Sequence, residues 1–241
     1  MAHLTFYYDL SSPWTYLAFH NVQTLVTEME ADVTWRPFLV GGVFNAVNQS
    51  VYAARSNPED PKVIHNFTWL HEWARVAQLP LNFPTQFHPL KSVLPMRACC
   101  ALEQDQAALR AFTRAAFHAY FADGRNLDEP SVIADIAHKV DLDGAALVTA
   151  ATQQEVKDKL RANTDEAIAR GAFGSPTMIV NGKQLYFGND QLPLVRQALA
   201  GCPCCGTAAL VRASARLSVL RHGRTCGCLG PHRRPWGARP A

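Results

Sequence analysis

The 241-residue sequence predicts an α/β protein in which a long helical segment separates two pieces that contain β-strands. Residues 4–39 have the pattern of a strand, a tight turn, a helix and a second strand. Residues 174–199 contain two short apolar runs joined by Asn181-Gly182, a strong hairpin signal, and then an amphipathic helix. Between these pieces, from residue 43 to about 170, apolar side chains recur mainly at helical spacing. The expected order is therefore β-α-β, then helices, then β-β-α.

The N-terminal piece begins with an apolar run at residues 4–8, which indicates a buried strand. Apolar side chains at helical spacing then predict a helix over residues 14–29. Residues 32–39 alternate like a second strand, which Pro37 ends or places at an edge, and Gly41-Gly42 predicts a break. Two strands joined by a helix within 40 residues favour a parallel pair with a right-handed crossover.

The middle of the chain is predicted to be helical in several separate segments. The expected helices cover residues 63–77, 95–101, 109–121 and 156–168, with a further short helix opening at Pro130. Prolines mark residues 81–89 as a loop, and Gly171 stands where a glycine commonly ends a helix. A last helix is expected over residues 192–199.

The composition is that of an ordinary globular protein, with 48% hydrophobic and 18% charged residues. No apolar run of about 18 residues predicts a membrane span, and the N-terminus lacks the features of a secretory signal. We therefore expect a cytoplasmic protein without a membrane partner. Residues 1–200 carry 16 basic and 20 acidic side chains, so no nucleic-acid partner is expected either.

The C-terminal residues 201–241 differ sharply from the rest of the chain. They contain seven Arg, no Lys, Asp or Glu, and five of the seven cysteines. The Cys-X-Cys spacing in this tail does not match the usual Cys-X₂-Cys zinc pairs, so no metal site is predicted. We interpret residues 201–241 as a disordered tail or a non-native extension, such as the product of a shifted reading frame.

Ser12-Pro13 lies at the start of the first expected helix, with Ser12 at the N-cap and Pro13 at the first helical position. Unpaired backbone N–H groups and the helix dipole would also stabilise an anion beside Ser12. The residues alone leave two interpretations open. Ser12 is either a helix cap or part of an anion-binding, catalytic position.

Several short motifs follow one another in a fixed order between residues 3 and 200. They are Tyr8-Asp9-Leu10-Ser11-Ser12-Pro13, Trp35-Arg36-Pro37-Phe38, Gly41-Gly42-Val43-Phe44, Asn48, Phe83-Pro84, Gly171-Ala172-Phe173-Gly174-Ser175-Pro176-Thr177 and Phe187-Gly188-Asn189-Asp190. Together they resemble the 2-hydroxychromene-2-carboxylate isomerases and the related kappa-class glutathione transferases, which have the thioredoxin fold of DsbA-like proteins. The resemblance implies a thioredoxin-like domain made of residues 1–41 and 171–200, with a helical insertion domain over 42–170.

The resemblance implies a glutathione site with Ser12 as the catalytic residue beside the glutathione sulfur. A hydroxyl at a helix N-terminus can hydrogen-bond a thiolate, and the helix dipole lowers the pKa of a thiol there. The family also implies a cis bond before Pro176. By the same resemblance, the glutathione-binding residues are Asn48, Ser175, Pro176, Gly188, Asn189 and Asp190, and Lys62 and Arg97 would bind the substrate.

Redox-active relatives carry Cys-Pro-X-Cys where this chain has Ser12-Pro13-Trp14-Thr15. Disulfide exchange is therefore not expected, because a hydroxyl forms no disulfide. The function implied is the glutathione-dependent isomerisation of 2-hydroxychromene-2-carboxylate, a small aromatic carboxylate, to trans-o-hydroxybenzylidenepyruvate in aromatic degradation. The alternatives are a kappa-like glutathione transferase and a DsbA-like thiol-binding protein without disulfide exchange. The family also suggests a homodimer.

Overall fold

The fold is described from a computed structural model, which describes residues 2–51 and 59–201. Its sheet has four strands in the order β2-β1-β3-β4. The strands are β1 (His3–Tyr8), β2 (Asp32–Pro37), β3 (Thr177–Val180) and β4 (Gln184–Phe187). β1 is parallel to β2, whereas β3 is antiparallel to both β1 and β4. The parallel pair and the C-terminal hairpin predicted from the sequence are confirmed.

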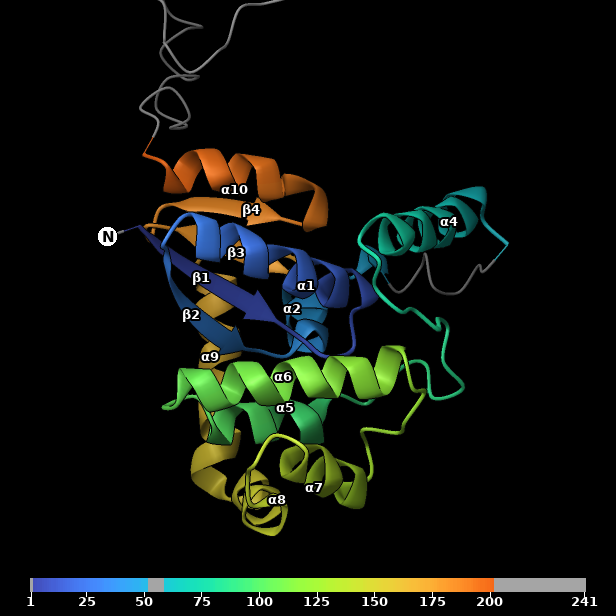
Figure 1. Ribbon diagram of the computed structural model, residues 1–241, viewed down its shortest axis with the longest axis vertical. Helices are drawn as coiled ribbons and strands as arrows, with labels where there is room; N and C mark the ends of the chain where they lie inside the picture. Colours follow the sequence, from blue (N-terminus) through green and yellow to red (C-terminus); the bar gives the residue numbers. More distant parts are fainter. Residues whose placement is uncertain (1, 52–58, 202–241) are drawn as a thin grey trace, which may run out of the picture. The chain divides into compact units, whose positions relative to one another are not determined.

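Helices make up most of the remaining structure in the described residues (Figure 1). They are α1 (Pro13–Glu28), α2 (Val40–Val47), α4 (Pro61–Val76), α5 (Val93–Ala101), α6 (Gln106–Phe121), α7 (Pro130–His138), α8 (Gly144–Thr152), α9 (Gln154–Ala169) and α10 (Leu192–Leu199), with a 3₁₀ turn η1 (Asn189–Gln191) before α10. Figure 1 shows α10 at one end of this unit and α5 to α8 at the other, with α4 standing beside the start of α1.

The two central strands, β1 and β3, are buried on both faces of the sheet. Alternate side chains such as Phe6 and Met178 lie in a core that includes Phe19 of α1 and Phe117 of α6. The opposite face carries Tyr7 and Ile179 into a smaller core with residues of α2 and α9. The two cores together fix the end of β1 and the start of α1, where the candidate site lies.

The predicted break at Gly41-Gly42 is wrong, because both glycines lie inside α2. A Cβ added to Gly42 would lie 2.9 Å from the Thr164 side chain, so this glycine lets α2 approach α9 closely. Several helices also begin earlier than their apolar pattern indicated. Asp60 caps α4 by accepting the Lys62 N–H, and Asp105 caps α6 by accepting the Ala107 and Ala108 N–H groups.

The predicted division into a thioredoxin-like domain and a helical insertion over residues 42–170 stays a prediction. Within the described unit, α5, α6 and α9 contact β2 directly. The predicted tail lies outside the described residues, apart from Gly201. None of the helices in residues 2–51 and 59–201 is both long enough and apolar enough to cross a membrane.

Candidate active site

The start of α1 is organised around the hydroxyl of Ser12. This residue has an extended backbone, with φ −97° and ψ 117°, and its Oγ accepts the Thr15 N–H at 3.2 Å. The same Oγ donates to the backbone oxygen of Ser175, also at 3.2 Å. Pro13 follows in the first turn of the helix. The predicted helix cap is confirmed, and its hydroxyl also joins α1 to a loop about 160 residues later in the chain.

That loop precedes β3 and contains a cis bond between Ser175 and Pro176, as the resemblance implied. Ser175 is buried, and its Oγ accepts the Asp9 N–H at 3.0 Å. It also shares a 2.8 Å hydrogen bond with the buried Thr15 hydroxyl. The backbone N–H of Ser175 has no partner among the residues that the structure describes. The loop is therefore held by hydroxyl groups, and no described residue accepts a hydrogen bond from the Ser175 N–H.

Asp9 supports this arrangement from beneath, where it is completely buried. Its carboxylate accepts the N–H groups of Ser11 at 2.9 Å and Val40 at 2.8 Å, and the Ser92 hydroxyl at 3.1 Å. Burial raises the pKa of the Asp9 carboxyl above its ordinary value, and these hydrogen bonds only partly oppose that rise. Because Val40 begins α2 and Ser92 precedes α5, the carboxyl group ties three helix starts together.

Two cavities meet at this point. The smaller one, of about 230 Å³, is lined by Ser12, Phe44, Asn48, His88, Phe173 and Ser175 among others. We call it the serine cavity. The larger one, of about 430 Å³, is lined by residues that include Trp14, Trp69, Trp73, Pro176, Asn189 and Asp190. We call it the tryptophan cavity. Trp14, Ser175 and Phe187 line both, so the two cavities are neighbours around the cis-proline loop.

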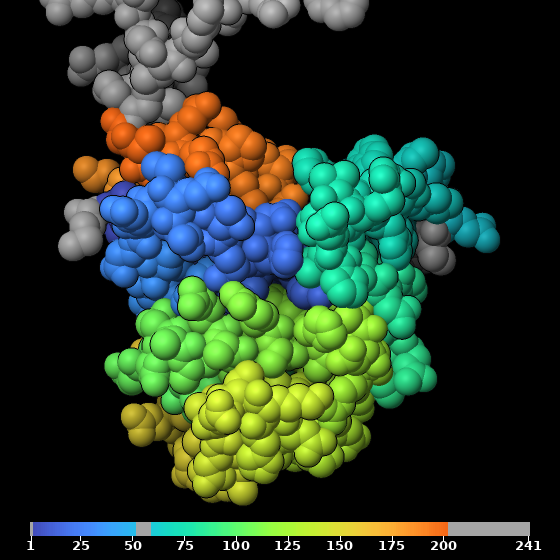
Figure 2. Space-filling view, viewed as in Figure 1, coloured from blue at the N-terminus to red at the C-terminus, as the bar shows by residue number. Residues whose placement is uncertain are grey.

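The tryptophan cavity lies where α4 approaches the start of α1. In the space-filling view, the surface of α4 adjoins that of α1 (Figure 2). Trp69 and Trp73 of α4 are 54% and 41% exposed on its surface. A hollow of larger volume, about 540 Å³, lies elsewhere, between α1 and α10. Its lining includes His20 and Arg196 but neither Ser12 nor Ser175, so we do not place the active site there.

Most of the expected glutathione-binding residues are brought together around these cavities. Asn48 lines the serine cavity and donates its amide N–H to the Phe173 carbonyl at 3.0 Å. Asn189 is buried and accepts a 2.8 Å hydrogen bond from Asn21 of α1. Asp190 is exposed next to it. Gly188 has a φ of +100°, and a Cβ there would lie 2.7 Å from Asp190 Oδ1, so glycine is required at this turn.

The two residues expected to bind the substrate are not brought to either cavity. Lys62 is exposed in the first turn of α4. Arg97 lies half-buried on α5, and its Nε is buried without a hydrogen-bond partner among the described residues. The resemblance assigned a substrate-binding role to these residues from their sequence position alone. Where the side chains point depends on how each helix is oriented in the fold.

Sequence reasoning missed several residues that line the cavities, among them two tryptophans and a histidine. Trp69 and Trp73 lie four positions apart on α4, off the buried side that carries Leu70 and Ala74. Two exposed indoles at helical spacing were a signal that could have been used. His88 lies in the loop between α4 and α5, and a single histidine in a proline-rich loop gave no comparable signal.

Cys99 and Cys100 are buried on α5 and line neither cavity. Burial raises the pKa of the Cys99 thiol to about 12, and the pKa of the Cys100 thiol is raised by burial and then by the charge of Glu103. In the part of the chain that the structure describes, no three His, Cys, Asp or Glu side chains gather as a metal site. The described thiols therefore do not take part in chemistry at Ser12.

A four-stranded mixed sheet with a cis-proline loop against the start of its first helix defines a thioredoxin-fold protein, here with hydroxyls where redox-active members have thiols. Residues 3–200 match the DSBA-like thioredoxin domain, and the chain belongs to that family. The predicted thioredoxin-like fold with added helices is confirmed.

The chain is similar to proteins with two different names. It is 29% identical over 206 residues to glutathione S-transferase kappa 2 of Caenorhabditis elegans, which covers 81% of this chain and 90% of that one. It is also 29% identical over 196 residues to a 2-hydroxychromene-2-carboxylate isomerase of Sphingobium xenophagum, covering 81% and 97%. A solved 2-hydroxychromene-2-carboxylate isomerase superposes with a TM-score of 0.68 at 22% identity, covering 90% of this chain and all of that one.

Proposed function

We propose that this chain is a glutathione-dependent isomerase that converts 2-hydroxychromene-2-carboxylate to trans-o-hydroxybenzylidenepyruvate. The observation that carries the proposal is the placement of the Ser12 hydroxyl. It caps α1, contacts the cis-proline loop and lines a cavity, while the described cysteines are buried elsewhere. A site built in this way can hold a thiolate but cannot itself exchange disulfides.

The residues around Ser175 fit glutathione. The N–H of Ser175, for which no described residue is an acceptor, offers a backbone hydrogen bond to a peptide-like ligand, and the carbonyl oxygen of Ser175 accepts the Ser12 hydroxyl. Asn189 and Asp190, at the start of η1, line the same tryptophan cavity and suit the charged γ-glutamyl end. The cavity volume of about 430 Å³ is of the size that small ligands occupy.

Bound glutathione would supply a thiolate nucleophile, whose reversible addition to a conjugated C=C bond allows rotation about that bond. Ser12 can turn its proton from the Ser175 carbonyl toward a sulfur while its lone pair still accepts the Thr15 N–H. The positive end of α1 favours the negative charge at that place. Phe44 and Phe173 give the serine cavity an apolar wall suited to an aromatic ring.

A kappa-like glutathione transferase is the second candidate, favoured by the similarity to glutathione S-transferase kappa 2. The same residues would hold glutathione, but the thiol would be consumed rather than released. A thiol-binding protein without catalysis is a third possibility that the same site permits. For the protein in the cell, we propose a cytoplasmic homodimer that acts in aromatic degradation.

The test is turnover of 2-hydroxychromene-2-carboxylate with glutathione, followed by absorbance while free thiol is titrated. The isomerase proposal predicts product formation with no loss of thiol, whereas equal loss of thiol and substrate would identify a transferase. Ser12→Ala should lower kcat by about 10²–10³, the usual effect of removing one donor to a developing anion. Asp143→Ala removes a comparable cap from the distant α8 and should leave kcat unchanged.

Unchanged turnover in Ser12→Ala would contradict the catalytic role. If the unmodified chain showed no thiol-dependent turnover, the remaining interpretation would be a thiol-binding protein without catalysis.

A further inference from the structure

We propose that the tryptophan cavity is an aromatic cage that binds an ammonium group, whether protonated or quaternary. Three indoles, those of Trp14, Trp69 and Trp73, line this one cavity together with the carboxylate of Asp190. The face of an aromatic ring attracts a cation, and tryptophan does so most strongly. The inference does not depend on the reaction proposed above, because it concerns only the charge of the group that the cavity accepts.

The charge of the cavity lining favours a cation. Asp190 is the one charged side chain among the described residues that line the cavity, and no lysine, arginine or histidine accompanies it there. Its Oδ2 accepts a hydrogen bond from Gln191 Nε2 at 2.8 Å, but Asp190 belongs to none of the ion pairs among the described residues. A positively charged ligand would therefore meet a carboxylate that no described cation neutralises.

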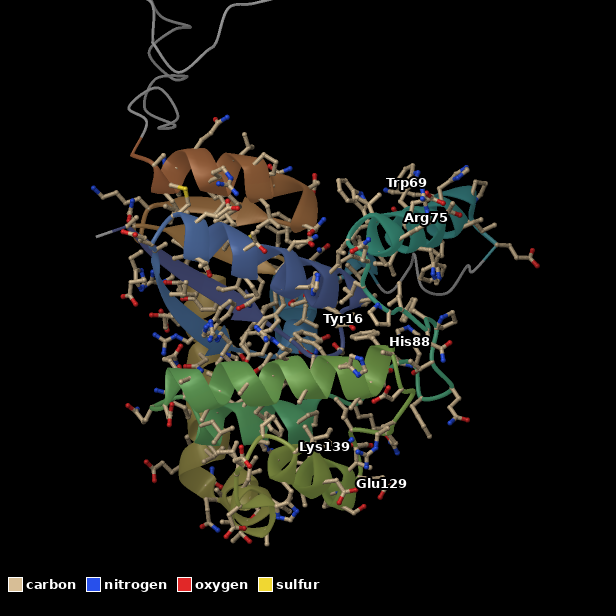
Figure 3. All side chains as sticks on the ribbon, in the orientation of Figure 1. Tyr16, Trp69, Arg75, His88, Glu129 and Lys139 are labelled. Carbon is tan, nitrogen blue, oxygen red and sulfur yellow. The ribbon has the colours of Figure 1, made fainter. Side chains whose placement is uncertain are left out.

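The indoles of α4 lie on one side of that helix. Asn66, Trp69 and Trp73 follow one another at spacings of three and four residues, which places them on the same face, and all three line the cavity. Both indoles are partly exposed, so burial in the core does not account for two such large rings on this face. Figure 3 shows Trp69 on α4, beside the start of α1 where Trp14 lies.

The basic side chains of α4 do not occupy the place of a ligand. Arg75, labelled near Trp69 in Figure 3, donates to Glu72 at 2.8 Å. The His65 ring stacks on Trp69, with centroids 6.0 Å apart and an angle of 20° between the planes. Neither His65 nor Lys62 lines the cavity. Because an indole has two faces, the stack with His65 leaves the other face of Trp69 for a ligand.

Two kinds of compound could bring an ammonium group to this cavity. In glutathione, the group would be the α-ammonium of the γ-glutamyl residue, since Ser175 and Pro176 line the same cavity. Otherwise, a separate amine would bind beside the thiol. A quaternary ammonium has no N–H to donate, so its binding would distinguish a cage from a site made of hydrogen bonds alone.

The experiment measures binding of choline and of 3,3-dimethylbutanol to the full chain by isothermal titration calorimetry. The alcohol has the shape of choline with carbon in place of the charged nitrogen, so the two ligands differ mainly in charge. The variants are Trp69→Leu, Trp73→Leu and Asp190→Asn. Phe67→Leu removes a partly exposed ring of α4 that lines neither cavity and serves as the control.

We expect choline to bind the unmodified chain at least about tenfold more tightly than the alcohol, because several indoles and a carboxylate act on one charge. Each tryptophan variant should reduce this preference about three- to fivefold, since leucine keeps an apolar surface but has no ring. Asp190→Asn should also reduce it, and Phe67→Leu should not. Equal affinity for the two ligands, equal weakening of both in the tryptophan variants, or no choline binding by the unmodified chain would each overturn the proposal.

Competition with glutathione distinguishes the two sources of the ammonium group, and either outcome supports the cage. Choline that is displaced by glutathione but not by N-acetylglutathione would assign the cavity to the γ-glutamyl ammonium. Choline binding that glutathione leaves unchanged would assign it to a separate amine. A chain that binds choline through these indoles but turns over no substrate would contradict the proposed reaction and not this inference.

Discussion

The start of α1 and the last turn of α5 place similar small polar groups in opposite environments. At the start of α1, Ser12 lines a cavity at the positive end of a helix, and Thr15 supports the loop beside it. In α5, Cys99 and Cys100 are buried among apolar side chains. Among the described residues, hydroxyls thus lie where a thiol would be activated, and the two thiols lie where activation is prevented, which agrees with the proposal that a ligand brings the nucleophilic sulfur.

Physical chemistry explains why the two places differ. A helix N-terminus stabilises a thiolate through unpaired N–H groups and the helix dipole, whereas an apolar core disfavours it. The pKa of the Cys99 thiol accordingly rises to about 12, and its sulfur lies 3.8 Å from the buried Thr113 hydroxyl. How reactive a cysteine is in this fold therefore depends on where it lies relative to the sheet and the helices.

The largest expected effect comes from moving a thiol to the active position. In Ser12→Cys, the new thiol should react with iodoacetamide at pH 7 at least about a thousandfold faster than Cys99, because their thiolate fractions differ by orders of magnitude. Peptide mass spectrometry of the full chain measures each cysteine separately. The same variant should form a mixed disulfide with oxidised glutathione, which the unmodified position cannot do.

The control for this comparison is Cys99 in urea, where burial is lost and alkylation should become fast. Similar alkylation rates of Cys99 and of the introduced thiol in the folded chain would show that the two environments do not differ as described.

The fold was predictable from the sequence wherever a local pattern matched the final structure. The strand at residues 4–8, the Asn181-Gly182 hairpin and the helix start at Ser12 each carry their own signal and were predicted correctly. Helix α2 was missed because its glycines suit close packing against Thr164 of α9, a partner far away in the sequence. Contacts between distant segments have no local signature.

The lack of a local signal for contacts between distant segments also limited what the sequence could predict of the candidate site. Ser12, Ser175 and Asn189 were suggested by motifs, and the structure gathers them around adjoining cavities. Their functional roles stay proposals. His88 reaches the serine cavity through a loop that is fastened to α4 and α6, and nothing within the loop sequence reveals that attachment.

A smaller effect is expected from the buried carboxyl group beneath the active hydroxyl. In Asp9→Asn, the amide NH₂ must face either the Ser11 or the Val40 N–H, so one accepted hydrogen bond is replaced by two opposed donors. The free energy of unfolding should fall by about 2–3 kcal/mol, measured by urea titration. Asp105→Asn, in which asparagine still caps α6, should change it little.

The loss of unfolding free energy in Asp9→Asn should also depend on pH. Because the pKa of Asp9 is raised in the folded chain, its protonation stabilises the fold below the unfolded pKa of about 3.9, and this contribution is lost as pH rises through the folded pKa. The variant lacks this titration. Its deficit relative to the unmodified chain should thus be larger near pH 4 than at pH 7, and a deficit that grows with pH would mean that the folded pKa is lowered.

The smallest expected effect concerns Thr15, whose hydroxyl contacts the cis-proline loop. Thr15→Val keeps the shape of the side chain but removes the 2.8 Å bond to Ser175. The unfolding free energy should fall by about 1 kcal/mol, and the KM for glutathione should rise several-fold with kcat unchanged, because the loop is loosened but Ser12 is retained.

Thr113→Val is the matched control, since it removes a 2.7 Å bond between two buried hydroxyls, those of Thr113 and Tyr8, away from both cavities. It should cost similar stability and leave the KM for glutathione unchanged. If the two variants raised this KM equally, Thr15 would be a packing residue like any other in the core. A rise confined to Thr15→Val, reversed in Thr15→Ser, would assign it the positioning of the loop that Ser12 contacts.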